Sequence, residues 1–170
     1  MKRLSILLTV LMTSVAALSQ RLINGEYLIK INDTGRYLSI AGAGMTNGAR
    51  LIQWDKGYDN HFRFILTHLG NDVYTLQSRH SGKFLSTEGA PRPGAKLIQW
   101  DWVNQDNQKW VIVPVKGSRG YAMSAYTGGL KVVIQHFNSL VTPANGAYSY
   151  LQGDPYFRTM ILDFKKNEAN

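Results

Sequence analysis

The feature that most constrains the fold of this chain is an internal repeat with a period of 46 or 47 residues. The pentapeptide Leu-Ile-Gln-Trp-Asp occupies residues 51–55 and recurs at residues 97–101. The same spacing separates several further pairs: Tyr27 and Tyr74, Gly35 and Gly82, Leu38-Ser39 and Leu85-Ser86, and Gly48-Ala49 and Gly94-Ala95. A weaker third copy begins near Tyr121, 47 residues after Tyr74. This period predicts three related units that pack together, because one such unit cannot bury its own apolar face.

Each unit has the sequence pattern of short strands. Apolar and other residues alternate along residues 27–31, 74–77 and 121–124, and this period of two is typical of β-strands. The first two runs end at turn-forming residues, 32–35 and 79–82. The pattern predicts an all-β chain, with about four short strands in each of three units.

Four segments together resemble the repeat of the ricin B-type lectin family. They are Gly25 to Ile29, Gly82-Lys83-Phe84-Leu85, the repeated Leu-Ile-Gln-Trp-Asp, and Asn107-Gln108-Lys109-Trp110, which contains the Gln-x-Trp signature of that family. The resemblance covers about residues 22–164. It implies a β-trefoil of three pseudo-repeats of about 47 residues, filling residues 20–170 with no space for a separate catalytic domain.

The N-terminal segment has the pattern of a signal peptide. Residues 1–19 combine a basic start, an apolar stretch over residues 4–12 and the small-x-small sequence Ala17-Leu18-Ser19. The apolar stretch is shorter than the roughly 20 residues needed to cross a bilayer. We therefore expect a secreted or periplasmic product with no membrane span. We also expect the protein to be a monomer. The chain has no cysteine, so its stability has to come from packing rather than from disulfides.

The Gln-x-Trp element is predicted to be mainly structural. With one residue between them, Gln108 and Trp110 point to the same face of a strand, so the indole can enter the core while the amide bonds backbone groups. We expect the element at Asn60-His61-Phe62 in the first unit and at Pro155-Tyr156-Phe157 in the third. Only the second unit has the full form.

The resemblance implies a shallow sugar pocket in each of the first two units, where an aromatic ring stacks on a pyranose and polar side chains bind its hydroxyls. Trp54 and Trp100 match the stacking rings of the family. Asn107 and Gln108 match its amide pair, and Asp59 and Asn60 stand there in the first unit. The candidate carbohydrate-binding residues are Ser39, Trp54, Asp59, Asn60, Ser86, Trp100, Asn107 and Gln108.

Two departures from the family pattern bear on specificity. Ser39 and Ser86 stand where galactose-binding members carry an aspartate, and a serine lacks the charge-assisted bonds of a carboxylate. The resemblance therefore does not by itself imply galactose specificity. Gln53 and Gln99 lie one residue after the position of the family's pocket glutamine, and a shift of one residue on a strand turns a side chain to the opposite face. Under the alternative reading, the two tryptophans are only packing residues.

Enzymatic function is not expected. The four histidines show no metal-ligand spacing, and the chain has no nucleophile motif or phosphate-binding glycine loop, so we predict no catalytic residue, metal or cofactor. The strongest rival function is a β-trefoil protease inhibitor, or another protein-binding module, that uses the divergent segment 137–154.

The charge balance suggests one further ligand class. The formal net charge of +8 becomes +6 without Lys2 and Arg3. Arg79, Lys83, Arg92 and Lys96 lie close in sequence and could favour acidic polysaccharides, whereas export argues against nucleic acid as a partner.

Overall fold

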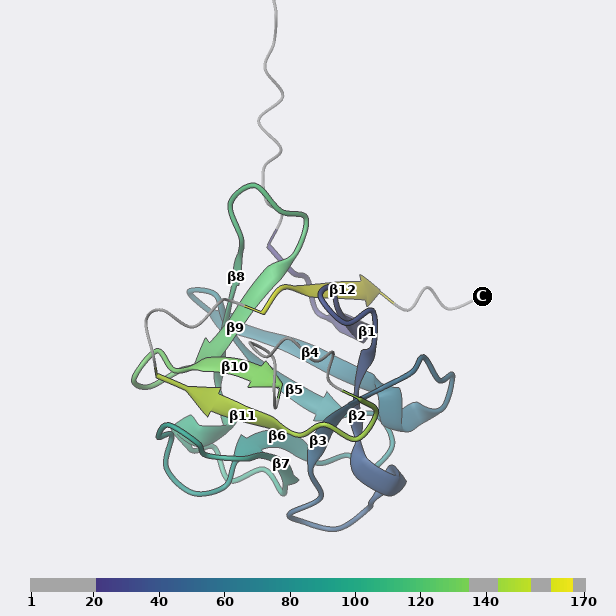
Figure 1. The fold of residues 1–170 in the computed structure, drawn as a ribbon. Helices are drawn as coiled ribbons and strands as arrows, with labels where there is room; N and C mark the ends of the chain where they lie inside the picture. Colours follow the sequence, from purple (N-terminus) through teal and green to yellow (C-terminus); the bar gives the residue numbers. More distant parts are fainter. Residues whose placement is uncertain (1–20, 135–143, 154–159, 167–170) are drawn as a thin grey trace, which may run out of the picture.

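The computed structural model describes residues 21–134, 144–153 and 160–166. The predicted signal peptide, residues 1–19, lies outside this part of the chain. The described residues form twelve β-strands and three short 3-10 helices, which confirms the all-β prediction (Figure 1).

Six of the strands close into a barrel. Each pairs with the next in the order β1, β4, β5, β8, β9 and β12, and β12 pairs with β1 to complete the ring. All of these pairs are antiparallel. The barrel strands are β1 (Gly25–Ile31), β4 (Arg63–Gly70), β5 (Val73–Ser78), β8 (Trp110–Pro114), β9 (Tyr121–Ala125) and β12 (Leu162–Lys166).

The other six strands form three hairpins, one for each sequence repeat. They are β2 (Tyr37–Ile40) with β3 (Leu51–Trp54), β6 (Phe84–Thr87) with β7 (Leu97–Trp100), and β10 (Lys131–Ile134) with β11 (Ser149–Gln152). Figure 1 shows β2, β3, β6, β7 and β11 together in the lower part of the view. A six-stranded barrel with three hairpins is a β-trefoil, as predicted. The 3-10 helices are η1 (Ala41–Ala43), η2 (Asn60–Phe62) and η3 (Asp106–Gln108).

Strand register identifies the equivalent residues of the three units. Tyr27, Tyr74 and Tyr121 recur every 47 residues and occupy equivalent positions in the barrel. They pair with Phe64, Trp110 and Leu162 respectively. Phe64, Trp110 and Leu162 are each at most 1% exposed, and the indole Nε1 of Trp110 donates to Leu85 O at 3.1 Å. They therefore fill one layer of the core.

This register corrects two sequence assignments. The segment equivalent to Gln108-Lys109-Trp110 is Phe62-Arg63-Phe64 in the first unit, two residues later than Asn60-His61-Phe62. In the third unit it ends at Leu162 rather than at Phe157, and the proposed segment Pro155-Tyr156-Phe157 lies outside the described residues. Sequence matching failed because the apolar replacements carry neither the amide nor the indole that makes the signature recognisable.

The three units are joined by equivalent glycine turns. Gly48, Gly94 and Gly146 have φ angles of +86°, +79° and +82°, a left-handed conformation that glycine adopts without strain. Their backbone N–H groups reach the next unit, and the third reaches back to the first. The bonds are Gly48 N to Gln99 O (2.9 Å), Gly94 N to Leu151 O (2.8 Å) and Gly146 N to Gln53 O (2.9 Å).

Candidate functional site

The second unit contains a pocket of about 350 Å³ that brings together three of the predicted site residues. Ser86 comes from β6, Trp100 from the end of β7 and Asn107 from η3. Trp100 is 41% exposed, whereas Ser86 is buried. The pocket is completed by Gly48, Thr87, Glu88, Gly89, Ile98, Val103 and Gln105.

Hydrogen bonds fix the polar wall of this Trp100 pocket. The Asn107 amide nitrogen donates to Ser86 Oγ at 3.1 Å and lies 3.3 Å from Thr87 O. Asn107 Oδ1 is buried and has no hydrogen-bond partner among the described residues. Because this oxygen is buried, the amide acts here through its nitrogen, which holds Ser86 Oγ and Thr87 O in place.

The first unit has an equivalent but smaller pocket of about 300 Å³. The predicted site residues Ser39 and Trp54 line it, and Trp54 is 45% exposed. The corrected register makes His61 the equivalent of Asn107, and His61 indeed lines this Trp54 pocket. The sequence reading missed His61 because it placed the signature element two residues too early.

Three predicted site residues do not line either pocket. Asp59 and Asn60 are exposed residues at the start of η2 and lie outside the Trp54 pocket. Gln108 is fully buried; its amide nitrogen donates to Asp101 O at 2.8 Å, and its Oε1 accepts from Val103 N at 2.9 Å. Gln108 therefore shapes the loop that leads into the Trp100 pocket.

Gln53 and Gln99 point away from the pockets, as the one-residue offset predicts. Both are fully buried. The Gln99 amide nitrogen donates to Gly44 O at 2.8 Å and Thr46 O at 2.9 Å. Gln99 thus bonds the second unit to a loop of the first.

The aspartates that follow the tryptophans also act between units. Asp101 accepts from the Asn47 amide at 2.8 Å, and Asp55 accepts from the Asn145 amide at 2.8 Å. Hydrogen bonds from Lys83 and then Asn47 hold the pKa of Asp101 below its usual value. The Leu-Ile-Gln-Trp-Asp motif therefore supplies one exposed pocket residue, Trp, beside residues that hold the trefoil together.

In its described hairpin, the third unit lacks the serine and the tryptophan of the two pockets. In the hairpin register Val133 takes the place of Ser39 and Ser86, because Val133 pairs with Tyr150 as those serines pair with Ile52 and Ile98. Gln152 likewise takes the place of the two tryptophans. The third unit therefore provides neither the hydroxyl nor the ring in this position. The rival inhibitory segment, 137–154, lies partly outside the described residues and stays a prediction.

The local charges are largely balanced. Among the four basic residues singled out in the sequence, Arg79 pairs with Glu26, Lys83 with Asp101 and Lys96 with Glu88. These pairs reduce the positive charge that a polyanion would meet. At the Trp54 pocket, burial lowers the pKa of His61 from its usual 6.5; Asp59 raises it and His80 lowers it further.

Within residues 21–134, 144–153 and 160–166, no three His, Asp or Glu side chains gather into a group that could hold a metal ion. No helix in that same part of the chain has the length and apolar character needed to cross a membrane.

The barrel and the three hairpins define a β-trefoil, with equivalent pockets in its first two units. The sequence matches the family described as ricin-type β-trefoil lectin domain-like over residues 18–100 and, overlapping, 73–147. The chain belongs to this family. No curated protein sequence matches it significantly.

Solved structures share the fold. The designed threefold-symmetric protein ThreeFoil is 25% identical with a TM-score of 0.76, and the match covers 84% of this chain and 99% of ThreeFoil. The Macrolepiota procera ricin B-like lectin, solved in complex with lactose, is 15% identical with a TM-score of 0.70, covering 87% and 99%. An exo-β-1,3-galactanase from Clostridium thermocellum is 17% identical with a TM-score of 0.75, covering 84% of this chain but 30% of the enzyme.

Proposed function

We propose that this chain is a secreted, non-enzymatic protein that binds carbohydrate through the Trp54 and Trp100 pockets. The observation that supports this most directly is the recurrence of one arrangement in two units: an exposed tryptophan beside a buried serine and a polar side chain from the following 3-10 helix. Burying indole surface under a sugar ring is favourable, and the polar groups can orient the ring through its hydroxyls. The lactose complex of the Macrolepiota procera lectin supports the same ligand class.

The two pockets are expected to differ in strength. The Trp100 pocket offers Ser86, whose hydroxyl is oriented by the amide of Asn107, and the carboxylate of Glu88. The Trp54 pocket offers His61 in place of the amide. We therefore assign the stronger binding to the Trp100 pocket. Both are shallow, so single-site dissociation constants of about 1 mM to 1 μM are expected, with avidity where one polymer reaches both.

Neutral glycans are the first ligands to test. Three of the four basic residues that suggested acidic polysaccharides have acidic partners, which leaves less positive charge to attract an acidic ligand. Any attraction between exposed charges is also weakened by salt. If acidic polysaccharides are nevertheless the ligand, binding will fall steeply between 50 and about 500 mM salt. Binding that does not change over this range indicates neutral recognition.

The proposal is tested on a glycan array with the protein as exported and with Trp54→Ala, Trp100→Ala and the double variant. Trp102→Ala is the matched control, since Trp102 is also 41% exposed but lies against Phe84 and outside both pockets. Each pocket variant is expected to weaken binding, the double variant to abolish it, and the control to bind normally. Binding that survives the double variant would refute the proposed sites, and no binding by the unaltered protein would refute the function.

A further inference from the structure

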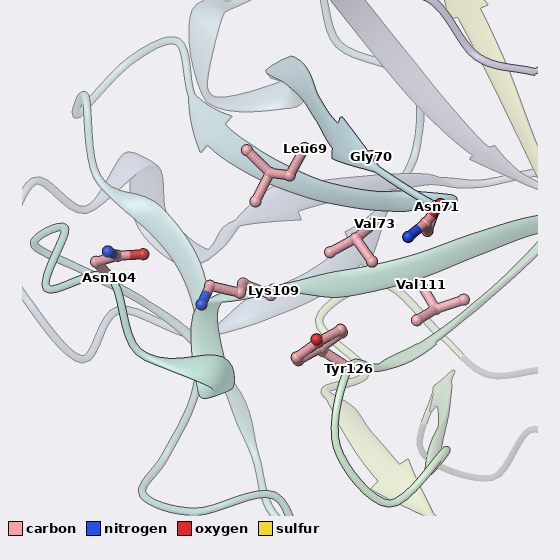
Figure 2. A pocket seen from close by; sticks show the side chains of 8 residues that line it. All are labelled: Leu69, Gly70, Asn71, Val73, Asn104, Lys109, Val111 and Tyr126. Carbon is pink, nitrogen blue, oxygen red and sulfur yellow. The ribbon is translucent and has the colours of Figure 1, made fainter.

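A third pocket, of about 500 Å³, lies on the barrel side of the second unit and contains none of the predicted site residues. We call it the Tyr126 pocket. Figure 2 shows Asn104 and Asn71 toward opposite ends of it, Leu69 and Val73 along one side, and Tyr126 on the other, with Lys109 between Asn104 and Tyr126. Tyr126 is 45% exposed. The pocket thus combines an aromatic ring with amide groups, as the Trp100 pocket does.

The equivalent place in the first unit is occupied by an ion-pair cluster. There Glu26 binds Arg63 at 3.0 Å and Arg79 at 3.2 Å. Strand register makes Val73, Lys109 and Tyr126 the second-unit counterparts of these three residues. The backbone agrees, because Arg79 N donates to Arg63 O just as Tyr126 N donates to Lys109 O.

The second unit therefore differs from the first by specific replacements. Valine in place of Glu26 removes the carboxylate that draws the two basic side chains together. Tyrosine in place of Arg79 puts an exposed ring beside the opening. The change replaces a charged cluster with an amphipathic surface suited to an uncharged ligand.

The Tyr126 pocket and the Trp100 pocket share a wall. Val103 and Gln105 line the Trp100 pocket, whereas Asn104, between them in the chain, lines the Tyr126 pocket. Neighbouring Cα atoms lie about 3.8 Å apart, so the backbone of the loop at residues 103–105 separates the two pockets. An extended ligand that crosses this loop would contact both.

We propose that the Tyr126 pocket is a subsite for a neutral pyranose of an oligosaccharide whose other end occupies the Trp100 pocket. This inference rests on the proposed function. Tyr126 supplies the face for stacking, and Asn71 and Asn104 supply amides for hydroxyls. Lys109 is already paired with Asp106 at 3.0 Å, so no net charge is required of the ligand.

The test compares chain lengths in isothermal titrations with glucose, galactose, mannose, xylose and N-acetylglucosamine and with their linear β-linked tetrasaccharides. Tyr126→Ala is expected to weaken binding of the best tetrasaccharide about fivefold, the loss of one aromatic contact. Its effect on the corresponding monosaccharide, which binds in the Trp54 and Trp100 pockets without needing the Tyr126 pocket, should be negligible. Arg79→Ala changes the counterpart position in the first unit and is the matched control, expected to change neither affinity.

A second variant guards against an effect on folding alone. Val73→Glu with Tyr126→Arg rebuilds the first unit's ion-pair cluster around Lys109, and we expect it to reduce the tetrasaccharide affinity while the monosaccharide affinity and the melting temperature remain unchanged. Equal affinities of the unaltered protein for monosaccharide and tetrasaccharide, or a tetrasaccharide affinity unaffected by both variants, would overturn the subsite while leaving the Trp100 pocket intact. Failure of every sugar to bind would overturn the proposed function itself, and the subsite with it.

Discussion

Replacing Gln99 by alanine should destabilise the fold without altering the Trp54 and Trp100 pockets. The Gln99 side chain is fully buried, donates to Gly44 O and Thr46 O, and accepts from Ser81 Oγ at 2.7 Å. The bonds to Gly44 O and Thr46 O connect two units of the trefoil, and the bond from Ser81 lies within the second unit. Each contributes about 1 kcal/mol net, so the free energy of unfolding should fall by about 3 kcal/mol, with a further loss for the cavity.

Thermal and urea unfolding measure this effect. For a chain of this size about 1 kcal/mol corresponds to 2–4 °C in melting temperature, so a decrease of about 6–12 °C is expected. Gln77→Ala is the control: Gln77 is half-buried and makes a local bond to Gly82 O at 2.7 Å, and its loss should cost about 1 kcal/mol at most. If Gln99→Ala melts within 2 °C of the unaltered protein, roughly the effect of half a kcal/mol, the reasoning fails. Loss of sugar binding at an unchanged melting temperature would instead place Gln99 in the pocket.

Three further predictions concern single residues. Asn107→Ala should weaken binding in the Trp100 pocket about tenfold, as expected for about 1.4 kcal/mol of lost hydrogen bonding, and an unchanged affinity in a titration would contradict this role. Trp110→Phe should fold, because Phe64 fills the equivalent core position. Urea unfolding should show a loss of about 1–2 kcal/mol in the free energy of unfolding, from the lost bond to Leu85 O and the lost side-chain volume. Failure to fold would show that the units are not interchangeable at this position. Because the pKa of His61 is lowered on folding, the unfolded state takes up the proton first, so stability should decline as the pH falls below 6.5 and level off below the folded pKa. His61→Asn should reduce this decline in melting-temperature profiles, and an identical profile would exclude His61 as its source.

The fold could be predicted from the sequence because the repeated residues are retained at the positions that form the barrel. Tyr27, Tyr74 and Tyr121 keep their spacing, and they occupy equivalent positions on β1, β5 and β9. The glycine turns keep theirs in the first two units because a left-handed backbone is hard to build from another residue. Features imposed by backbone geometry thus leave a visible pattern in the sequence.

The site could be predicted only in part. Trp54, Trp100, Ser39 and Ser86 lie on hairpins whose register follows from the repeat, and the structure places each in a pocket. His61 was missed because the position of Gln108 is occupied by Phe62 in the first unit and by Met160, two residues before Leu162, in the third. Both replacements are buried and apolar, so the amide that makes the signature recognisable is absent. The Tyr126 pocket is formed by side chains from strands and loops that are far apart in the sequence. No local sequence pattern could therefore predict it.

Contact between sugar and the rings of Trp54 and Trp100 is tested most directly by a titration followed by nuclear magnetic resonance, which reports the indole N–H signals of the four tryptophans. With a glycan that binds, the Trp54 and Trp100 signals should shift, while the signal of the buried Trp110 stays in place. A glycan that binds while the Trp54 and Trp100 signals stay fixed would contradict the proposed sites.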